Sequence, residues 1–221
     1  QADAFGKKAV QSHPAQETQA GLEGRKEYGE DCLNLNIYVP ARDALEARRE
    51  GRGLPVAVYI HGGAFQNGSN RDRSGKQIIR DHSFIYVSIN YRLGVLGYLY
   101  LGAALGEEYR GTGNNGTLDQ LAALRWIYDN IGEFGGDCSR ITVFGESAGA
   151  KTLGALLLRP ELKTCCSQVL MASGAYQCIR EEETAAAVAD SFFSPRATAV
   201  ISPVRKSCWK SRRKVRSACV R

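Results

Sequence analysis

The segment ITVFGESAG, residues 141–149, holds the side chains most able to take part in a chemical step. An apolar, β-branched run ends abruptly in Gly-Glu-Ser-Ala-Gly, and a stretch of small helix-forming residues follows. This order of strand, sharp turn and helix is that of the G-x-S-x-G nucleophile elbow, which lifts a serine hydroxyl clear of a sheet. Gly145 and Gly149 fit a turn at which strand and helix pass too close for a side chain. The alternative is an ordinary strand-to-helix turn, because the short pattern also arises by chance. The context predicts a nucleophile at Ser147.

The elements that would position this turn alternate between strands and helices along the chain. Continuous or alternating apolar runs predict strands, and apolar residues at helical spacing predict helices. Such an alternation indicates an α/β fold with a mostly parallel sheet covered by helices on both faces. The expected strands are 32–39, 55–61, 84–90, 141–144 and 167–172, and the expected helices are 75–82, 117–134 and 150–158.

Two of these segments carry more detailed expectations. The loop over 91–115 is rich in Gly and Tyr and long for a compact domain, which is typical of a functional loop. In the helix predicted over 117–134, Thr117 is the expected N-cap and Gly132 stands near the C-terminus. Its expected apolar face consists of Leu118, Leu121, Leu124, Ile127 and Tyr128.

Composition excludes several classes of protein. A content of 43% hydrophobic and 24% charged residues is that of a soluble globular protein, and apolar runs such as 56–60 are far too short to span a bilayer. Residues 191–221 hold nine Lys or Arg and no acid, whereas the remainder has 20 basic and 23 acidic residues. The body therefore gives no electrostatic reason to expect nucleic acid as a partner. Seven irregularly spaced cysteines without a C-x-x-C pair argue against a zinc site.

Five segments in the same order resemble the type-B carboxylesterases, the cholinesterase-like branch of the α/β-hydrolase fold. They are GEDCLNLNIYVP (29–40), PVAVYIHGGAF (55–65), VSINYRLGVLGY (87–98), GNNGTLDQLAALRWIYDNIGEFGGD (113–137) and ITVFGESAGA (141–150). The resemblance covers about 29–174 and predicts an incomplete α/β-hydrolase domain over 29–190. A polar, poorly ordered leader is expected over 1–28, and a basic tail outside the family pattern over 191–221.

The resemblance assigns roles residue by residue. Ser147 matches the nucleophile that forms an acyl-enzyme, and Gly62, Gly63 and Ala148 match the backbone N–H donors of the oxyanion hole. The attack of a serine on an ester carbonyl creates an oxyanion that such donors stabilise. His61 is expected to brace the oxyanion loop rather than to act as the base. The implied substrate is a small-molecule carboxylic ester, with no cofactor and no metal ion.

One part of the family pattern is missing from this sequence. The expected order is Ser, then Asp or Glu, then His, but His13, His61 and His82 all precede Ser147. Both ends of the family domain look cut, and Cys32 matches a family disulfide cysteine whose partner lies earlier. Without a base the serine is a weak nucleophile, so the chain alone is expected to be nearly inactive. Missing strands are expected to leave an apolar sheet edge and to lower solubility.

Three further interpretations remain open. The chain could be a non-catalytic cholinesterase-like interaction module, although such relatives usually lose the nucleophile that Ser147 retains. The basic tail could bind nucleic acid or a membrane surface. The sequence G-x-G-x-x-G at 111–116 resembles a dinucleotide fingerprint, but it does not directly follow a predicted strand.

Asn67 and Asn115 begin glycosylation sequons, and Asn115 is expected to be unmodified within a packed segment.

Overall fold

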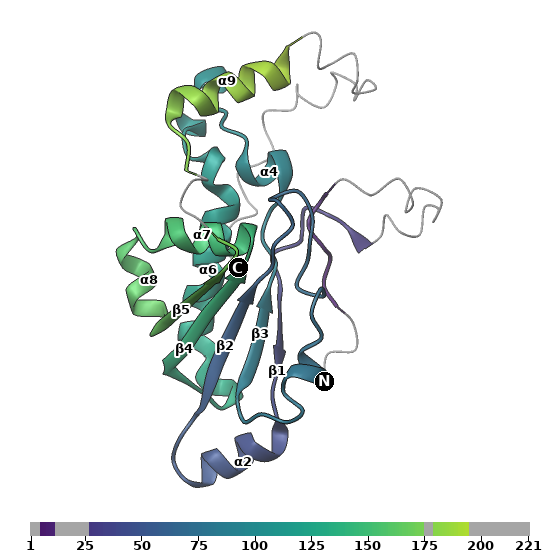
Figure 1. Ribbon diagram of the computed structural model, residues 1–221, viewed down its shortest axis with the longest axis vertical. Helices are drawn as coiled ribbons and strands as arrows, with labels where there is room; N and C mark the ends of the chain where they lie inside the picture. The colour runs from purple at the N-terminus through teal and green to yellow at the C-terminus, as the bar shows by residue number, and fades with distance from the viewer. Residues whose placement is uncertain (1–4, 12–26, 175–178, 195–221) are drawn as a thin grey trace.

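The computed structural model describes residues 5–11, 27–174 and 179–194 (Figure 1). The strands of these ranges form one sheet in the order β1-β3-β2-β4-β5. Three of its pairings (β2 with β3, β2 with β4, β4 with β5) are parallel, and β1 pairs antiparallel with β3. The predicted mostly parallel sheet is confirmed. Its strands are β1 (Leu35–Tyr38), β2 (Leu54–Ile60), β3 (Ile85–Ile89), β4 (Gly136–Glu146) and β5 (Gln168–Ala172).

The longer helices lie on one face of this sheet or at its ends. Among the described residues, the predicted cover of the other face is limited to the short helix α3 (Gly75–Ile78), where a Cβ on Gly75 would lie 2.2 Å from the Tyr38 ring. Figure 1 shows α6, α7 and α8 on one side of the strands, α2 at the lower end and α9 at the upper end. The helices are α2 (Ala41–Arg49), α3 (Gly75–Ile78), α4 (Gly94–Tyr98), α5 (Gly102–Leu105), α6 (Asn115–Asn130), α7 (Ala148–Leu156), α8 (Pro160–Cys165) and α9 (Glu182–Phe193), with 3-10 turns at Glu107–Tyr109, Thr112–Asn114 and Ile131–Phe134.

The two faces of the sheet differ in composition because side chains alternate along each strand. On one face the apolar residues of β2, β3 and β4, such as Val58 and Val143, join Leu124 and Leu153 of the helices in a single core cluster. The opposite face carries aromatic residues: the ring of Tyr59 lies 5.2 Å from that of Phe144 and 6.5 Å from that of Tyr86. The buried apolar face fixes the register that places the carboxyl ends of β2 and β4 side by side.

The sheet is less covered at β5. Within the described residues β5 pairs only with β4, and its exposed and half-buried residues alternate. Leu170, on the same face as Phe144, is 62% exposed. β5 therefore presents an uncharged edge strand with an exposed apolar side chain.

The long helix α6 differs from its prediction at its beginning and on its surface. It begins at Asn115, so the prediction of Thr117 as N-cap is wrong. Leu121, Leu124 and Ile127 are buried as predicted, whereas Leu118 is 45% and Tyr128 38% exposed. At 100° per residue, Leu118 lies roughly 180° around the helix from Ile127, so the two cannot share one face.

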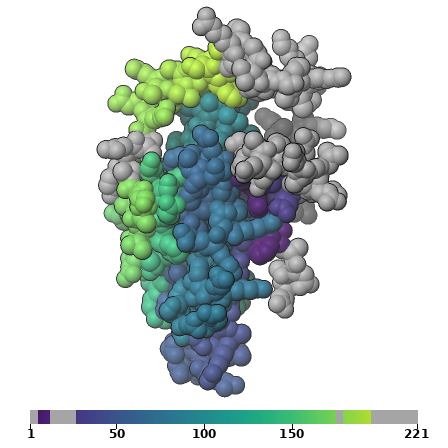
Figure 2. All heavy atoms as spheres, turned by 45° about the vertical axis from the view of Figure 1, so that its right-hand side comes forward, coloured from purple at the N-terminus to yellow at the C-terminus, as the bar shows by residue number. Residues whose placement is uncertain are grey.

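The predicted domain boundaries fall partly outside the described ranges. Of the predicted leader, residues 5–11 pack against the body: the Gly29 amide donates to the Lys8 carbonyl at 3.0 Å and Ala9 joins the core. Helix α9 crosses the predicted boundary at 190 and closes one end of the molecule (Figure 2). It is held there by Glu182, which accepts from Arg110 at 3.0 Å. The basic tail from residue 195 on lies outside the described residues.

The segment 91–115 is not an irregular loop, because it contains α4, α5 and two 3-10 turns. These elements separate the G-x-G-x-x-G sequence from β3, so it lacks the preceding strand that a dinucleotide fingerprint needs. Gly116 serves packing instead, since a Cβ there would lie 2.6 Å from the Arg92 carbonyl oxygen. No helix of the described ranges has the length and apolar character needed to cross a membrane.

Candidate active site

Ser147 occupies the turn between β4 and α7 in a backbone conformation that non-glycine residues rarely adopt. Its φ is 51° and its ψ −113°. The turn is fixed on both sides: the Ser147 amide donates to the Ala172 carbonyl of β5 at 2.9 Å, and the Lys151 amide of α7 donates to the Ser147 carbonyl at 2.9 Å. Non-glycine residues with such dihedrals cluster at functional sites, where the surrounding structure supports the strain. The hydroxyl-bearing residue is therefore held in the geometry of a nucleophile elbow.

The glycines that flank Ser147 allow this turn to pack. A Cβ on Gly145 would lie 2.6 Å from the Gly149 carbonyl carbon, and a Cβ on Gly149 would lie 2.3 Å from the Ile60 carbonyl oxygen. Both contacts are with backbone atoms, which cannot move aside as a flexible side chain can. The close approach of strand and helix expected from the sequence is confirmed, and it also brings the end of β2 against the turn.

The loop that follows β2 places its glycines beside Ser147. A Cβ on Gly62 would lie 3.3 Å from the Ser147 Cβ and 2.6 Å from Glu146 Oε2. Gly63 has a φ of 104°, and the loop folds back as the Gln66 and Asn67 amides donate to the Gly63 carbonyl at 2.9 and 3.0 Å. The structure thus brings Gly62 against Ser147, with Gly63 next in the chain. Ala148 follows Ser147 directly as the first residue of α7 and is buried.

His61 lies beneath this loop and is 1% exposed. Its ring stacks on Tyr91 with the centroids 4.4 Å apart, and the Tyr91 hydroxyl donates to the His61 carbonyl at 2.7 Å. Its Nδ1 lies 2.8 Å from the Gly62 carbonyl oxygen, an acceptor, so Nδ1 carries the proton. Burial lowers the pKa of the imidazole, which is therefore neutral. This geometry favours a brace for the loop over a general base.

Gln11 supports the same loop from the N-terminal segment. Its side-chain Oε1 accepts from the Gly68 amide at 3.0 Å, and its Nε2 donates to the Gly68 carbonyl at 3.1 Å. Gly68 has a φ of 111°, and a Cβ there would lie 2.4 Å from His61 Nδ1. Sequence reasoning missed Gln11, because no local pattern indicates a contact across 57 residues.

The Glu146 side chain also lies against Gly62, because a Cβ on that glycine would be 2.6 Å from Glu146 Oε2. The pKa of the exposed Arg73 guanidinium is raised first by its hydrogen bond to Tyr59 and to a smaller extent by the Glu146 carboxylate. In the described ranges no group of three or more His, Cys, Asp or Glu side chains is arranged to hold a metal ion.

A second feature missed from the sequence is the ion pair between Arg92 and Asp119. Arg92 donates from Nε and Nη2 to the two carboxylate oxygens at 2.7 and 2.6 Å, and its backbone amide adds a third bond at 3.1 Å. The Asp119 side chain is only 5% exposed. The pair ties the segment after β3 to helix α6.

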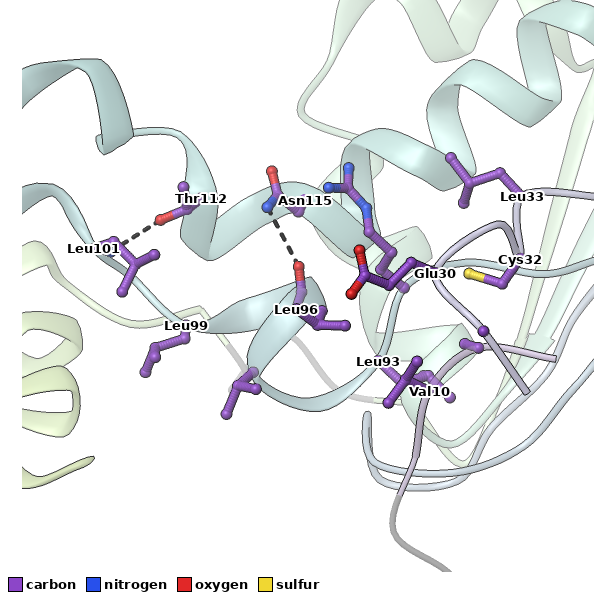
Figure 3. A pocket seen from close by; sticks show the side chains of 14 residues that line it. Val10, Glu30, Cys32, Leu33, Leu93, Leu96, Leu99, Leu101, Thr112 and Asn115 are labelled. Atoms are coloured by element: carbon purple, nitrogen blue, oxygen red, sulfur yellow. Dashed lines mark hydrogen bonds between the residues drawn. The ribbon is translucent and has the colours of Figure 1, made fainter. Parts of the chain in front are cut away.

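A cavity of about 400 Å³, lined in part by Arg92, lies beside this ion pair (Figure 3). Its walls are mostly apolar, and hydrogen bonds from Asn115 to the Leu96 carbonyl and from the Leu101 amide to Thr112 close one side. The thiol of Cys32 is buried in the wall, and burial raises its pKa. None of the predicted catalytic residues lines this cavity.

Comparisons with known proteins agree with this arrangement. The model of the carboxylesterase family matches residues 1–194. The chain is 40% identical over 158 residues to the para-nitrobenzyl esterase of Bacillus subtilis, which covers 71% of this chain and 30% of that protein. It is also 37% identical over 166 residues to mouse neuroligin-3. The solved structure of a carboxylesterase from Geobacillus stearothermophilus superposes with a TM-score of 0.71 at 40% identity, over 85% of this chain and 36% of that one.

These relatives are much longer than the chain, which spans about 30% of the curated esterase and 36% of the solved one. The family match nonetheless extends over every described element, from the N-terminal segment to α9. The fold, the strained serine turn and the extent of the match lead to one conclusion. The chain belongs to the carboxylesterase family, and its fold is that of the α/β-hydrolases.

Proposed function

We propose that this chain carries the nucleophile half of a carboxylic ester hydrolase, with Ser147 as the acyl-forming residue. The Ser147 Oγ would bond to the ester carbonyl carbon, moving the carbonyl electrons onto oxygen. The tetrahedral intermediate would then expel the alcohol, and water would release the acid from the acyl-enzyme. The observation that carries the proposal is the positive φ of Ser147 in a turn against which Gly62 is packed.

The oxyanion donors follow from the same arrangement. Gly62, Gly63 and Ala148 are the proposed N–H donors, because the loop after β2 and the first turn of α7 both adjoin Ser147. The N-terminal end of α7 adds a partial positive charge at the same place. Loss of one such donor typically reduces the rate by about 10²–10³. The tight packing of Gly62 and the hydrogen-bonded loop support a site that is organised before substrate binds.

The described residues do not supply a general base in this proposal. His61 is buried and engaged with Gly62. His82 precedes β3, whose five residues run parallel to β4, so a strand length of roughly 17 Å separates it from the Ser147 end of the sheet. His13 lies outside the described residues. We therefore expect turnover by this chain alone to be lower by on the order of 10⁶ than that of a complete triad.

Covalent labelling with a fluorophosphonate tests the assignment. The reagent should react slowly and mark Ser147, as located by peptide mass mapping, and Ser147→Ala should abolish the reaction. Ser139→Ala, at the opposite end of β4, should label like the unaltered chain. Labelling at another serine would contradict the nucleophile assignment, and rapid labelling would contradict the expected lack of a base. A complete absence of labelling would favour the non-catalytic interaction module.

A further inference from the structure

The loop beside Ser147 contains Asn67-Gly68, one of two Asn-Gly pairs in the sequence; the other is Asn115-Gly116. In such a pair the glycine backbone nitrogen can attack the preceding side-chain amide, because glycine offers no side chain to hinder the approach and rotates freely. The product is a cyclic imide, which water opens to a carboxylate. Whether a given pair reacts depends on how firmly the fold holds its two reacting groups.

The two pairs lie in different environments. Asn67 is exposed and lies outside helices and strands. Asn115 is the first residue of α6, with φ −52° and ψ −49°, and its Nδ2 donates to the Leu96 carbonyl at 3.3 Å. Gly116 is buried in the same helix. The helical backbone and the engaged amide hold Asn115 in place, whereas the Asn67 side chain is open to water.

Gln11 is hydrogen-bonded to the backbone nitrogen that would react in the Asn67-Gly68 pair. The Gly68 amide, which would be the attacking group, donates its proton to Gln11 Oε1 at 3.0 Å. The reciprocal bond from Gln11 Nε2 to the Gly68 carbonyl at 3.1 Å fixes the orientation of the same residue. An amide that is held in this way neither turns toward the Asn67 side chain nor readily loses its proton.

We propose that Asn67 is a site of spontaneous deamidation and that the two hydrogen bonds between Gln11 and Gly68 restrain it. In the first step the Gly68 nitrogen bonds to the Asn67 Cγ, the Cγ–Nδ2 bond breaks, and ammonia leaves with the proton of the Gly68 amide. In the second step water adds to the imide and opens it to aspartate or isoaspartate. Water is the only co-reactant, and no atom is oxidised or reduced.

The modification would change the charge beside the proposed oxyanion hole. A Cβ on Gly63 would lie 2.4 Å from Asn67 Oδ1, so the side-chain amide of Asn67 lies directly against Gly63. A carboxylate at this place would repel a developing oxyanion. This consequence, unlike the modification itself, rests on the proposed function of Ser147.

Peptide mass mapping of the folded chain during incubation in mildly alkaline buffer measures the modification independently of any activity. Asn67 should convert faster than Asn115. Gln11→Met, which keeps the side-chain length and removes both hydrogen bonds, should accelerate conversion at Asn67 by about fivefold, the equivalent of one neutral hydrogen bond, and leave Asn115 unchanged. Gln66→Met, the same substitution in the same loop, should leave both rates unchanged. Equal rates at the two asparagines, or no effect of Gln11→Met, would overturn the proposal.

A second variant guards against unfolding. If Gln11→Met also accelerates Asn115, the fold has opened, and Gln11→Glu becomes the decisive comparison. The glutamate retains the acceptor for the Gly68 amide and loses only the donor to the Gly68 carbonyl, so Asn67 should convert more slowly than in Gln11→Met. Conversion of Asn67 as fast as in Gln11→Met would contradict the proposal. Fluorophosphonate labelling of Asn67→Asp should be roughly tenfold slower than that of Asn67→Gln because of the added charge. Equal labelling would count against the oxyanion assignment and leave the mass result standing.

Discussion

The two sides of Ser147 differ in how firmly they are built. On the β2 side, the loop after the strand is held by His61, Tyr91 and Gln11 through stacking and hydrogen bonds. On the β5 side, a single backbone bond from Ser147 to Ala172 reaches an edge strand whose Leu170 is 62% exposed. The proposed oxyanion half is thus preorganised by residues of this chain. In hydrolases with a Ser-His-Asp triad, catalysis also needs an acidic residue and a histidine base.

The largest effect is expected where backbone packing joins β2 to the serine turn. Gly149→Ala places a Cβ 2.3 Å from the Ile60 carbonyl oxygen, and the resulting overlap should cost about 3 kcal/mol or more of unfolding free energy. Gly132→Ala is the matched control, because no atom lies within 4 Å of its Cβ and its φ is not positive. That variant should stay within about 1 kcal/mol of the unaltered chain. Equal urea midpoints for the two variants would show that the turn is not closely packed.

The ion pair next to the cavity should rank second. Asp119→Asn leaves the Arg92 guanidinium without its buried carboxylate and should lower the unfolding free energy by about 2–3 kcal/mol. Arg42→Ala removes an exposed pair with Glu46 and should change it by less than about 0.5 kcal/mol. Chemical denaturation of both variants measures the difference. A loss for Asp119→Asn as small as that for Arg42→Ala would mean that the segment after β3, which carries Tyr91, does not depend on its ion pair with α6.

The burial of His61 under the loop after β2 predicts that the unfolding free energy depends on pH. Burial lowers the His61 pKa below its usual 6.5, so the unfolded chain binds a proton first as the pH falls. Stability should therefore be complete above about pH 6.5 and fall below it, by at most about 1.4 kcal/mol per pH unit. His61→Asn should remove this part of the loss, and His82→Asn should retain it. The unfolding free energy of each variant between about pH 7.5 and 5.5 tests the point; an identical acid loss in His61→Asn would exclude His61 as its source.

The smallest effect on stability, but a visible one on solubility, is expected on the β5 side. Leu170→Lys adds a charge to an uncharged edge strand and should reduce self-association while changing the unfolding free energy by less than about 0.5 kcal/mol. Leu158→Lys changes a still more exposed leucine beyond the end of α7 and serves as the control. Light scattering compares the two. Equal improvement from both would mean that the sheet edge is not the associating surface.

The parts of the fold that sequence predicted are those determined by local patterns. Examples are the continuous apolar run of β2 and the strand, turn and helix around Ser147. Both can be predicted because they depend on residues that are close together in the sequence. Helix α6 shows the limit. The apolar periodicity predicts that a helix forms. Which of its sides is buried depends on the elements packed against it, so the sequence pattern places Leu118 on the wrong face. Gln11 and the Arg92–Asp119 pair join distant segments and leave no local signal.

In the proposed mechanism Ser147 is held in position to attack an ester, and the described residues supply no general base for it. The rate of fluorophosphonate labelling as a function of added imidazole tests it most directly, because free imidazole can take the serine proton in place of a histidine. Labelling should be slow in buffer and should become faster in proportion to imidazole, with no reaction in Ser147→Ala. Fast labelling without imidazole would show that a base is already present. No labelling at any imidazole concentration would contradict the assignment of Ser147 as the nucleophile.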